Sequence, residues 1–434
     1  MTSPPATPPP DSQGEQRFEQ IYELCEWPED YRPGGFHPIN LGDTFRDGKY
    51  KVIRKLGEGS FSTAWLVVST DRPKYVALKV TEAESSTACT ELTILDHLSK
   101  VAHKDPNSRH TMQLLDSFRH KGPNGIHQCL VFEPMGGSAA SLVEELPENN
   151  PKMYGIPQRY PKRMAKIILL HALRGLSFLH QNSIVHGDFQ PGNLLFSINS
   201  IDEVEQQHLE QDEAHTAVPL LRLDGKTDRW APTKLYVRQS LHHHAQLGLD
   251  LCVKISDFGA AFRTGSPPPK PVTPRALRAP ELILKQDFDS GIDIWSFGCL
   301  MYEFLTGEVL FAVMMIGRTQ QDRDDADDDH LIQMHNIIRP LSSLIMGAWP
   351  RASTWFDSEG KPVQQDGGDE TEEENGSGIY VYDTLEQRFA KRKHPDIDDE
   401  EAAVICQLIR EILVYDPAER PSAAELLKHP WFSE

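Results

Sequence analysis

The chain has 434 residues and carries 44 Lys and Arg against 64 Asp and Glu, a formal net charge of −20. Hydrophobic residues make up 39% and charged residues 25%, which is typical of a globular protein and excludes a wholly disordered chain. The length suits two or three domains, or one large bilobal domain. The acidic character argues against direct binding of nucleic acid and favours a basic partner.

The cysteines and the apolar segments exclude further classes of protein. Six cysteines are scattered without a Cys-x-x-Cys pair, which argues against a disulfide framework or a zinc site and fits a reducing compartment. The first residues have neither a basic start nor an apolar core, so we expect no secretory signal. No apolar run reaches the roughly 18 residues that a membrane span needs, and we expect no membrane partner.

Composition and periodicity divide the chain into a tail and two lobes. Residues 1–20 begin with a run rich in Pro, Thr and Ser, and predict a disordered tail. Residues 21–135 form an N-terminal extension and a small β-rich lobe, with a helix over 91–98. Its strands are predicted at 49–55, 64–69, 75–80 and 128–132.

Helices dominate the large lobe, residues 136–434. The apolar positions of residues 163–180 predict a long amphipathic helix. Three stretches interrupt this lobe and are interpreted as loops or insertions. They are a spacer at about 199–250, a Pro-rich stretch at 264–274 and an acidic stretch at about 357–378.

A glycine-containing loop, Leu56-Gly57-Glu58-Gly59-Ser60-Phe61-Ser62, lies between two predicted strands. Two glycines let backbone N–H groups approach phosphates closely. Ser62 occupies the place of the third glycine of G-x-G-x-x-G, and on this motif alone a tight β-hairpin is an equal alternative. A strand follows the loop where a dinucleotide-binding fold would have a helix.

Lys79 lies one hairpin further along the chain, in an apolar strand. Its place after a glycine loop suggests a cation for the α- and β-phosphates of a nucleotide, although a solvated edge lysine is the simpler alternative. Such a lysine needs a carboxylate to hold it, and Glu91 on the first helix is the nearest good candidate. Glu91 could equally be a solvated helix residue.

Two short motifs supply the remaining chemistry. His186-Gly187-Asp188-Phe189-Gln190-Pro191-Gly192-Asn193 places Asp188 to accept a proton from a hydroxyl and Asn193 to ligate Mg²⁺. Asp257, in Asp257-Phe258-Gly259 after a strand, would hold a metal that bridges phosphates. Each motif alone could be a turn, but the order of loop, Lys, Glu, Asp, Asn and Asp-Phe-Gly is a specific set.

With these motifs the chain resembles a eukaryotic protein kinase from about residue 46 to 432. Ala279-Pro280-Glu281 resembles the end of an activation segment, and Asp293-Ile294-Trp295-Ser296-Phe297-Gly298 resembles the anchoring helix of the large lobe. The resemblance implies an α+β bilobal fold with a small β-rich lobe and a large helical lobe. It also implies an ion pair between Arg420 and Glu281.

Among kinases the sequence most resembles the SR-protein kinases. The shared runs are EDY (29–31), GGFHP (34–38), GD (42–43), YKVIRKLG (50–57) and FSTAWL (61–66). Residues 199–250 occupy the place of that family's long spacer. This resemblance implies a monomeric serine/threonine kinase for Arg/Ser-rich proteins that regulates mRNA splicing or processing factors, in the cytoplasm and the nucleus.

The resemblance assigns a role to each site residue, with ATP and Mg²⁺ as cofactors. Lys79, Glu91 and Asp188 are the catalytic residues, and Asn193 and Asp257 are the metal ligands. The nucleotide-binding residues are Leu56, Gly57, Glu58, Gly59, Ser60, Phe61, Ser62, Thr63, Ala64, Ala77, Lys79, Glu133, Met135 and Leu195.

Three positions depart from the kinase pattern. Gln190 stands where a lysine normally contacts the γ-phosphate, and Gly187 replaces the arginine that binds a phosphorylated activation loop. Thr273 is one residue out of register for the threonine that bonds the catalytic aspartate, and Pro274 holds that place. These departures leave two alternatives to an active protein kinase. One is a pseudokinase or ATP-binding scaffold, and the other is a small-molecule kinase, because the loop HGDFQPGN resembles the corresponding loop of such enzymes.

Acidic residues cluster twice in the large lobe. The cluster over 366–374 is interpreted as a solvating loop. The cluster over 322–329 comes before a predicted helix whose start, Asp327-Asp328-Asp329, resembles the site where SR-protein kinases dock Arg-rich peptides. Asp329 would be the docking residue, and the family's next acid is Asn336 here. We expect a protein substrate with Ser flanked by Arg.

Overall fold

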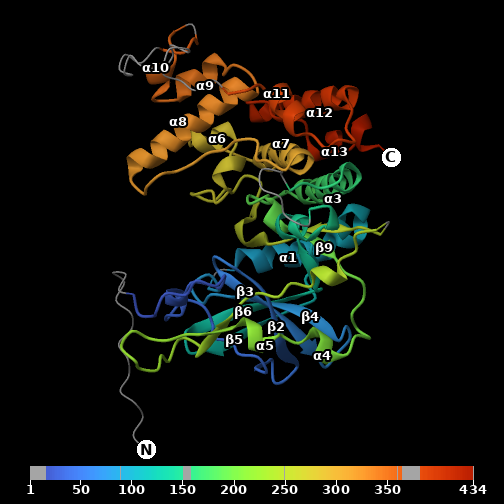
Figure 1. The fold of residues 1–434 in the computed structure, drawn as a ribbon, viewed down its shortest axis with the longest axis vertical. Helices are drawn as coiled ribbons and strands as arrows, with labels where there is room; N and C mark the ends of the chain where they lie inside the picture. Colours follow the sequence, from blue (N-terminus) through green and yellow to red (C-terminus); the bar gives the residue numbers. More distant parts are fainter. Residues whose placement is uncertain are drawn as a thin grey trace, which may run out of the picture. The chain divides into compact units, whose positions relative to one another are not determined.

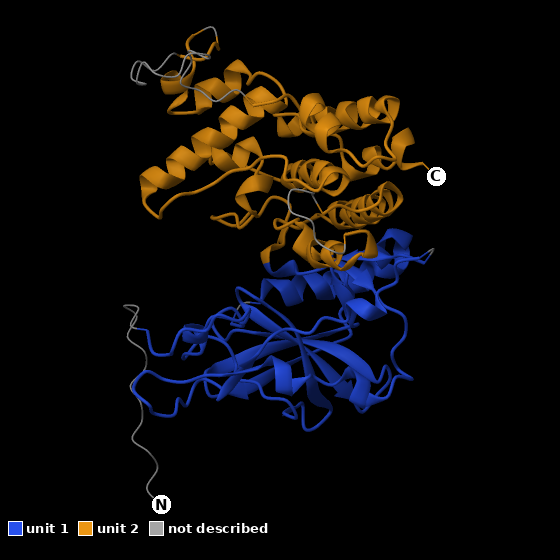
Figure 2. Cartoon of the chain, viewed as in Figure 1, with its two compact units in different colours: residues 1–138, 195–259 blue, residues 139–194, 260–434 orange. Residues whose placement is uncertain are grey.

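The structure is a computed structural model that describes residues 16–87, 89–149, 158–248, 250–358, 360–363 and 382–433. The chain divides into two compact units (Figure 2). Unit 1 comprises Met1–Ser138 and Leu195–Gly259, and unit 2 comprises Ala139–Leu194 and Ala260–Glu434. All six cysteines are free thiols. Among the described residues no helix combines the length and the apolar character needed to cross a membrane.

Unit 1 is built on an antiparallel six-stranded sheet in the order β1-β2-β3-β4-β6-β5 (Figure 1). Alternating side chains of these strands, among them Trp65, Leu78 and Val131, are buried in its core, as period-2 patterning requires. The predicted strands are confirmed. The bounds are β1 (Thr44–Phe45), β2 (Tyr50–Gly59), β3 (Ser62–Ser69), β4 (Tyr75–Thr81), β5 (Asp116–Gly122) and β6 (Gly125–Phe132).

Helix α1 (Thr90–Val101) is the long helix of unit 1 and confirms the helix predicted over 91–98. Ile94, Leu95 and Leu98 are buried at helical spacing. Strand β5 was not predicted, because its sequence DSFRHKG is polar and lacks an alternating apolar pattern.

The spacer predicted in the large lobe packs with unit 1 instead. Its residues Ile201, Leu209 and Leu241 are buried in one cluster with Ile53 of β2 and Tyr75 of β4. Its own elements are short. They are α4 (Gln206–Leu209), α5 (Glu213–Thr216), and β10 (Ala217–Pro219) paired with β11 (Lys234–Tyr236). The flanking strand β9 (Leu194–Ser197) pairs with β7 (Met135–Ser138) and with β12 (Val253–Ile255), which follows the spacer.

This placement corrects the domain division made from sequence. The division assigned residues 136–434 to the large lobe, whereas residues 195–259 lie with unit 1. The physical reason is apolar burial, because leucines of the spacer cover apolar residues of the sheet that would otherwise face water. The acidic stretch predicted at about 357–378 falls largely outside the described residues.

Unit 2 is mainly helical, with α7 buried along nearly its whole length. The amphipathic helix predicted over 163–180 is confirmed as α3. The helices are α2 (Ala139–Leu142), α3 (Lys162–Gln181), α6 (Pro280–Ile283), α7 (Gly291–Thr306), α8 (Gln320–Ile337), α9 (Ser343–Ala348), α10 (Ala352–Trp355), α11 (Leu385–Arg392), α12 (Asp399–Ile412) and α13 (Ala423–Leu426). Strands β8 (Ile184–Val185) and β13 (Phe262–Arg263) pair antiparallel.

Candidate active site

In unit 1, the ammonium group of Lys79 on β4 meets two carboxylates. Its Nζ donates to Glu91 Oε1 and Oε2 at 2.7 and 2.9 Å and to Asp257 Oδ1 at 2.8 Å. Burial by itself lowers the pKa of Lys79, but the charges of Asp257 and Glu91 outweigh it and raise the pKa above its ordinary value. Lys79 is therefore a fixed cation, and the predicted pairing with Glu91 is confirmed.

Asp257 follows β12 in an unusual backbone conformation. Its φ is +59°, in the left-handed region that residues other than glycine rarely adopt. The N–H of Gly259 donates to Asp257 Oδ1 at 3.2 Å, and the side chain is 47% exposed. Such strain is concentrated at functional sites, where it aims a side chain. An exposed carboxylate is also the kind of ligand that Mg²⁺ prefers.

The glycine loop is the turn of the hairpin between β2 and β3. Leu56–Gly59 lie on β2, Ser60 and Phe61 form the turn, and Ser62, Thr63 and Ala64 lie on β3. A Cβ placed on Gly57 would meet no atom within 4 Å, so no protein neighbour requires glycine there. The space over the loop is open, which lets a ligand approach the backbone closely.

Small side chains line one face of the sheet next to Lys79. Ala64 is paired with Lys79 across β3 and β4, and Ala77 lies two residues before Lys79 on the same strand, so the three share a face. Their strand neighbours Trp65 and Leu78 are buried on the opposite face. The side chains beside Lys79 on this face are therefore small.

The other predicted nucleotide-binding residues also lie in unit 1. The carboxylate of Glu133 pairs with Lys254 at 2.5 Å. Met135 is on β7, and Leu195 is on the neighbouring strand β9, where it pairs with Ser138. The predicted nucleotide residues therefore share one unit, although they come from segments far apart in the sequence.

In unit 2, Asp293 at the start of α7 holds the backbone that precedes the predicted base. It is 1% exposed, and it accepts hydrogen bonds from His186 N at 2.8 Å, Gly187 N at 2.9 Å and His180 Nε2 at 3.0 Å. Burial raises the pKa of Asp293, but the contacts with His180, His186 and Gly187 outweigh it, so the pKa lies below its ordinary value. Sequence reasoning missed this role, for which the helix motif DIWSFG is the signal.

Two amides orient the carboxylate of Asp188. Gln190 Nε2 donates to both carboxylate oxygens at 2.9 Å. Asn193 Nδ2 donates to the Asp188 carbonyl at 2.8 Å and to Oδ2 at 3.0 Å. The loop therefore holds Asp188 in a defined position for accepting a proton. Gln190, which replaces the usual lysine, takes part in this arrangement.

The other two departures also have structural explanations. Gly187 has a φ of +76°, and a Cβ there would lie 2.9 Å from the carbonyl oxygen of Ala260. An arginine at this position would therefore be strained and would clash with backbone. Thr273 is buried, and its hydroxyl donates to the Gly187 carbonyl at 2.7 Å. Thr273 thus contacts the catalytic loop directly before Asp188, despite its shifted register.

Glu281 and Arg420 form the predicted ion pair in unit 2. Two contacts of 2.5 and 2.7 Å join the guanidinium to the two carboxylate oxygens, and both side chains are at most 2% exposed. The remaining Arg420 donors reach backbone carbonyls of Val414, Tyr415 and Gly291. This bidentate pair ties the end of the activation segment to the C-terminal part of the unit.

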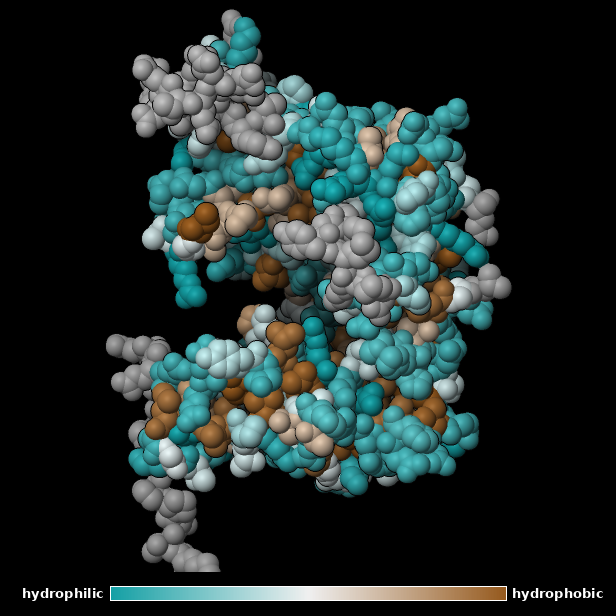
Figure 3. Space-filling view, viewed as in Figure 1, coloured by the Kyte–Doolittle hydropathy of each residue, from teal (hydrophilic) through white to brown (hydrophobic). Residues whose placement is uncertain are grey.

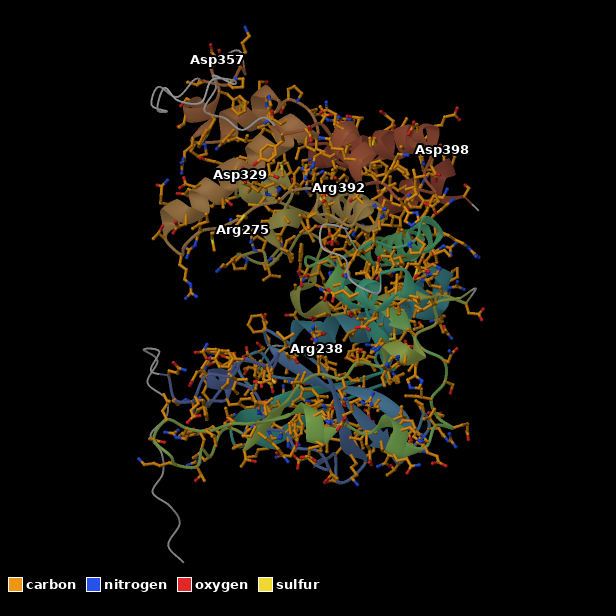
Figure 4. All side chains as sticks on the ribbon, viewed as in Figure 1. Arg238, Arg275, Asp329, Asp357, Arg392 and Asp398 are labelled. Carbon is orange, nitrogen blue, oxygen red and sulfur yellow. The ribbon has the colours of Figure 1, made fainter. Side chains whose placement is uncertain are left out.

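The acidic cluster lies inside α8, which corrects the prediction that it comes before a helix. The helix begins after Thr319, whose side chain and that of Asp322 form a capping box. Asp322 is the acid of this cluster that lies in the first turn, where the helix dipole stabilises a carboxylate, and the other acids follow further along the helix. Figure 3 shows a mostly hydrophilic surface over α8, and Figure 4 labels Asp329 on this helix and Arg275 on the segment beside it.

Three neighbouring acids of α8 have different partners. Asp327 pairs with Arg275 at 2.8 Å, and buried Asp328 accepts from the indole N–H groups of Trp349 and Trp355. Asp329 accepts from Gln333 Nε2 at 2.8 Å and from the Tyr382 hydroxyl at 2.9 Å. Asp329 thus has uncharged donors, and within the described part of the chain no cation lies in ion-pair distance of it. Among the described residues, no cation balances its negative charge.

Comparison with known proteins identifies the family. The protein kinase domain family matches residues 50–209 and 239–432, most of the chain. The chain belongs to the protein kinase family. The unmatched residues between these ranges fall in the spacer. A crystal structure of a kinase domain matches with a TM-score of 0.59 and 25% identity over 91% of this chain and 98% of that one, so the kinase fold is confirmed.

Several relatives of this kinase are SR-protein kinases. A serine/threonine-protein kinase SRPK of Physarum polycephalum is 30% identical over 94% of this chain and 91% of its own length. Protein kinase dsk1 of Schizosaccharomyces pombe is 27% identical over 97% and 87%. SRSF protein kinase 3 of Homo sapiens is 37% identical over 41% of this chain and 30% of its own. The predicted resemblance is confirmed, and the enzyme is a serine/threonine protein kinase.

The comparisons leave the two alternatives without support. The three relatives described above are named as protein kinases, not as scaffolds or small-molecule kinases. The family acts on protein substrates and generally uses ATP and Mg²⁺.

We expect Gln190→Ala to lower kcat by about 10-fold or more, because Asp188 would lose both donors of the Gln190 amide. Gln190→Lys should equal or exceed wild-type kcat, since an ammonium group can donate to Asp188 and adds a cation near the transferring phosphate. Steady-state kinetics at saturating ATP measure both effects. A Gln190→Ala enzyme with wild-type kcat would show that the two contacts have no role in the reaction.

Proposed function

We propose that this kinase transfers the γ-phosphate of Mg-ATP to serine residues flanked by arginine, in Arg/Ser-rich proteins. The observation that carries the proposal is the carboxylate of Asp329 on α8, whose partners among the described residues are the uncharged donors Gln333 and Tyr382. Carboxylates of this kind favour guanidinium groups, which bind them bidentately. One relative is itself named an SRSF protein kinase.

The residues present fit Mg-ATP. The open space over Gly57 leaves the loop backbone accessible to phosphates, and Lys79 is a fixed cation beside it on the sheet. The carboxylate of Asp257 and the amide oxygen of Asn193 are hard oxygen donors of the type that bind Mg²⁺. Bound Mg-ATP would supply the phosphoryl group and the charge neutralisation for its transfer.

The chain's own residues account for the remaining steps. Asp188 would accept the proton of the substrate hydroxyl, while Gln190 and Asn193 keep its carboxylate oriented. Lys79 would hold the phosphates in position, and Glu91 keeps Lys79 in place. The likeness to SR-protein kinases is also the basis for proposing that the enzyme acts as a monomer on mRNA-processing factors, in the nucleus and the cytoplasm.

The substrate proposal is tested with a peptide array and the variant Asp329→Ala. We expect enrichment of Arg around the phosphorylated Ser, and binding that weakens as salt rises, because the attraction between exposed charges is screened. Asp329→Ala should raise KM for an Arg-Ser peptide several-fold and leave kcat nearly unchanged, since docking is remote from the transferred phosphate.

A matched control is Asp399→Ala, which removes a carboxylate that is 98% exposed on a different helix, α12. This variant should keep the wild-type KM. If the array shows no preference for Arg, the substrate proposal fails while the enzyme remains a kinase.

A further inference from the structure

A buried lysine, Lys55, lies on β2 immediately before the glycine loop. Its side chain is 0% exposed, and its Nζ pairs with the carboxylate of Glu26, which is 2% exposed. The same Nζ donates to the carbonyl of Tyr236 at 2.8 Å, and the backbone N–H of Lys55 donates to Gln211 Oε1 at 2.9 Å. Lys55 is thus held by the N-terminal extension through Glu26 and by the spacer through Gln211 and Tyr236.

An irregularity in β2 lets Lys55 reach the glycine loop. In a regular strand residues 55 and 58 would point to opposite faces of the sheet. The register between β2 and β3 shifts between Lys55 and Gly57, as at a β-bulge. The shift brings Lys55 Nζ to 3.1 Å from Oε2 of Glu58, the residue between Gly57 and Gly59.

Glu58 thereby connects the glycine loop to the N-terminal extension and to the spacer. Its side chain is 16% exposed, and its second oxygen lies 3.8 Å from Arg238 Nη1 of the spacer, a residue labelled in Figure 4. Glu58 and Glu26 balance the charges of Lys55 and Arg238. Two carboxylates and two cations therefore form one connected group, part of it buried, at the base of the loop.

The N-terminal segment that carries Glu26 is itself attached to the spacer. This segment includes residues 16–20, which corrects their assignment to a disordered tail. The Tyr31 hydroxyl donates to Glu26 Oε1 at 2.5 Å, which fixes the orientation of that carboxylate. Tyr31 and Phe18 are buried in a cluster with Leu220 and Leu235 of the spacer. Arg17 links the two segments again, through ion pairs to Glu29 and Asp228. The extension and the spacer thus support each other beside the sheet.

We infer that Glu26 is a positioning residue for the nucleotide, which acts through Lys55 and Glu58 on the glycine loop. The inference rests on the use of ATP proposed above. The Lys55 ammonium is held by Glu26 and the Tyr236 carbonyl, and Glu58 is attracted to that fixed charge. When the Glu26 carboxylate is removed, Glu58 provides the carboxylate that remains within ion-pair distance of Lys55 Nζ among the described residues. The Lys55 ammonium group and the Glu58 carboxylate then move toward each other. This movement displaces the glycine loop from the position in which it binds phosphates.

The experiment compares ATP binding of the wild-type chain and of Glu26→Gln by isothermal titration calorimetry, together with KM for ATP and kcat. We expect Kd and KM for ATP to rise about fivefold, with kcat at saturating ATP within about twofold of wild type. Partial unfolding would have a different signature, because it lowers the binding stoichiometry and kcat and leaves the Kd of the folded fraction unchanged.

The matched control is Glu23→Gln, which makes the same charge change three residues away at an exposed position. Its Kd should equal that of wild type. An unchanged Kd in folded Glu26→Gln, or an equal rise in Glu23→Gln, would overturn the inference. Failure of the wild-type chain to bind ATP would instead overturn the proposed nucleotide.

A paired variant covers the case in which Glu26→Gln does not fold. Glu26→Gln with Lys55→Met removes the buried pair as a whole, so neither of its two charges is left without the other. Glu58 also loses Lys55 in this variant, so its Kd for ATP should again rise about fivefold. A wild-type Kd would contradict the inference.

Discussion

Replacing Asp188 by Ala should lower kcat by about 10²–10⁴-fold, the contribution typical of a general base. Asp188 is the carboxylate that Gln190 and Asn193 hold in position, and neither amide can accept a proton in its place. The fold should persist, because Asp293 still accepts hydrogen bonds from the backbone N–H groups of His186 and Gly187, which precede Asp188. Single-turnover phosphate transfer from ATP to an Arg-Ser peptide measures the effect.

The control for this variant is Asp287→Asn, which alters an exposed aspartate elsewhere in unit 2. Its kcat should match that of wild type. The affinity of Asp188→Ala for ATP should also be close to wild type, since the nucleotide residues lie on unit 1. Asp188 is not the base if the Ala variant keeps most of the transfer rate.

Replacing Arg420 by Met should reduce the free energy of unfolding by about 3–5 kcal/mol. The substitution leaves the Glu281 carboxylate unpaired in a site where both side chains are at most 2% exposed. It also removes donors to the carbonyls of Val414 and Tyr415. Urea unfolding followed by tryptophan fluorescence gives the change. The buried Trp295, over which the guanidinium lies at 5.1 Å, is one of the seven tryptophans that contribute to the signal.

A surface ion pair of the same kind serves as the comparison. Arg410 pairs with Glu386 in a bidentate contact at 2.8 Å, but the two side chains are 24% and 52% exposed. Arg410→Met should cost about 0–1 kcal/mol, because water solvates the carboxylate that remains. Glu281→Gln together with Arg420→Met should recover part of the loss, since it leaves no lone buried charge. Equal costs for the two single arginine variants would contradict the argument from burial.

Local patterns predicted most of the regular structure and the chemistry of the site. Alternating apolar residues predicted β2, β3 and β4, and helical spacing predicted α1 and α3 to within a few residues. The pairing of Lys79 with Glu91 followed from the need of a buried cation for a carboxylate. Strand β5 was missed because its partner β6, rather than its own composition, makes it a strand.

The departures from the kinase pattern had no explanation in the linear sequence. In the linear sequence Gln190 indicates only that the usual cation is missing. In the structure its amide donates to both carboxylate oxygens of Asp188. In the linear sequence Gly187 indicates only that the usual arginine is missing. In the structure its positive φ would strain any other residue, and the nearby Ala260 carbonyl would clash with a side chain. In the linear sequence Thr273 is one residue out of register, but in the structure its hydroxyl donates to the carbonyl of Gly187, directly before Asp188.

The order and spacing of short motifs along the chain were enough to identify the kinase family and its reaction. These follow from spacing within short segments, where strand and helix periods place side chains predictably. The tertiary structure alone decided that the spacer packs with unit 1, that Glu26 meets Lys55, and that the acids of α8 have different partners. Such contacts join residues far apart in the chain, and they depend on which buried surfaces and charges must be matched once the whole chain has packed.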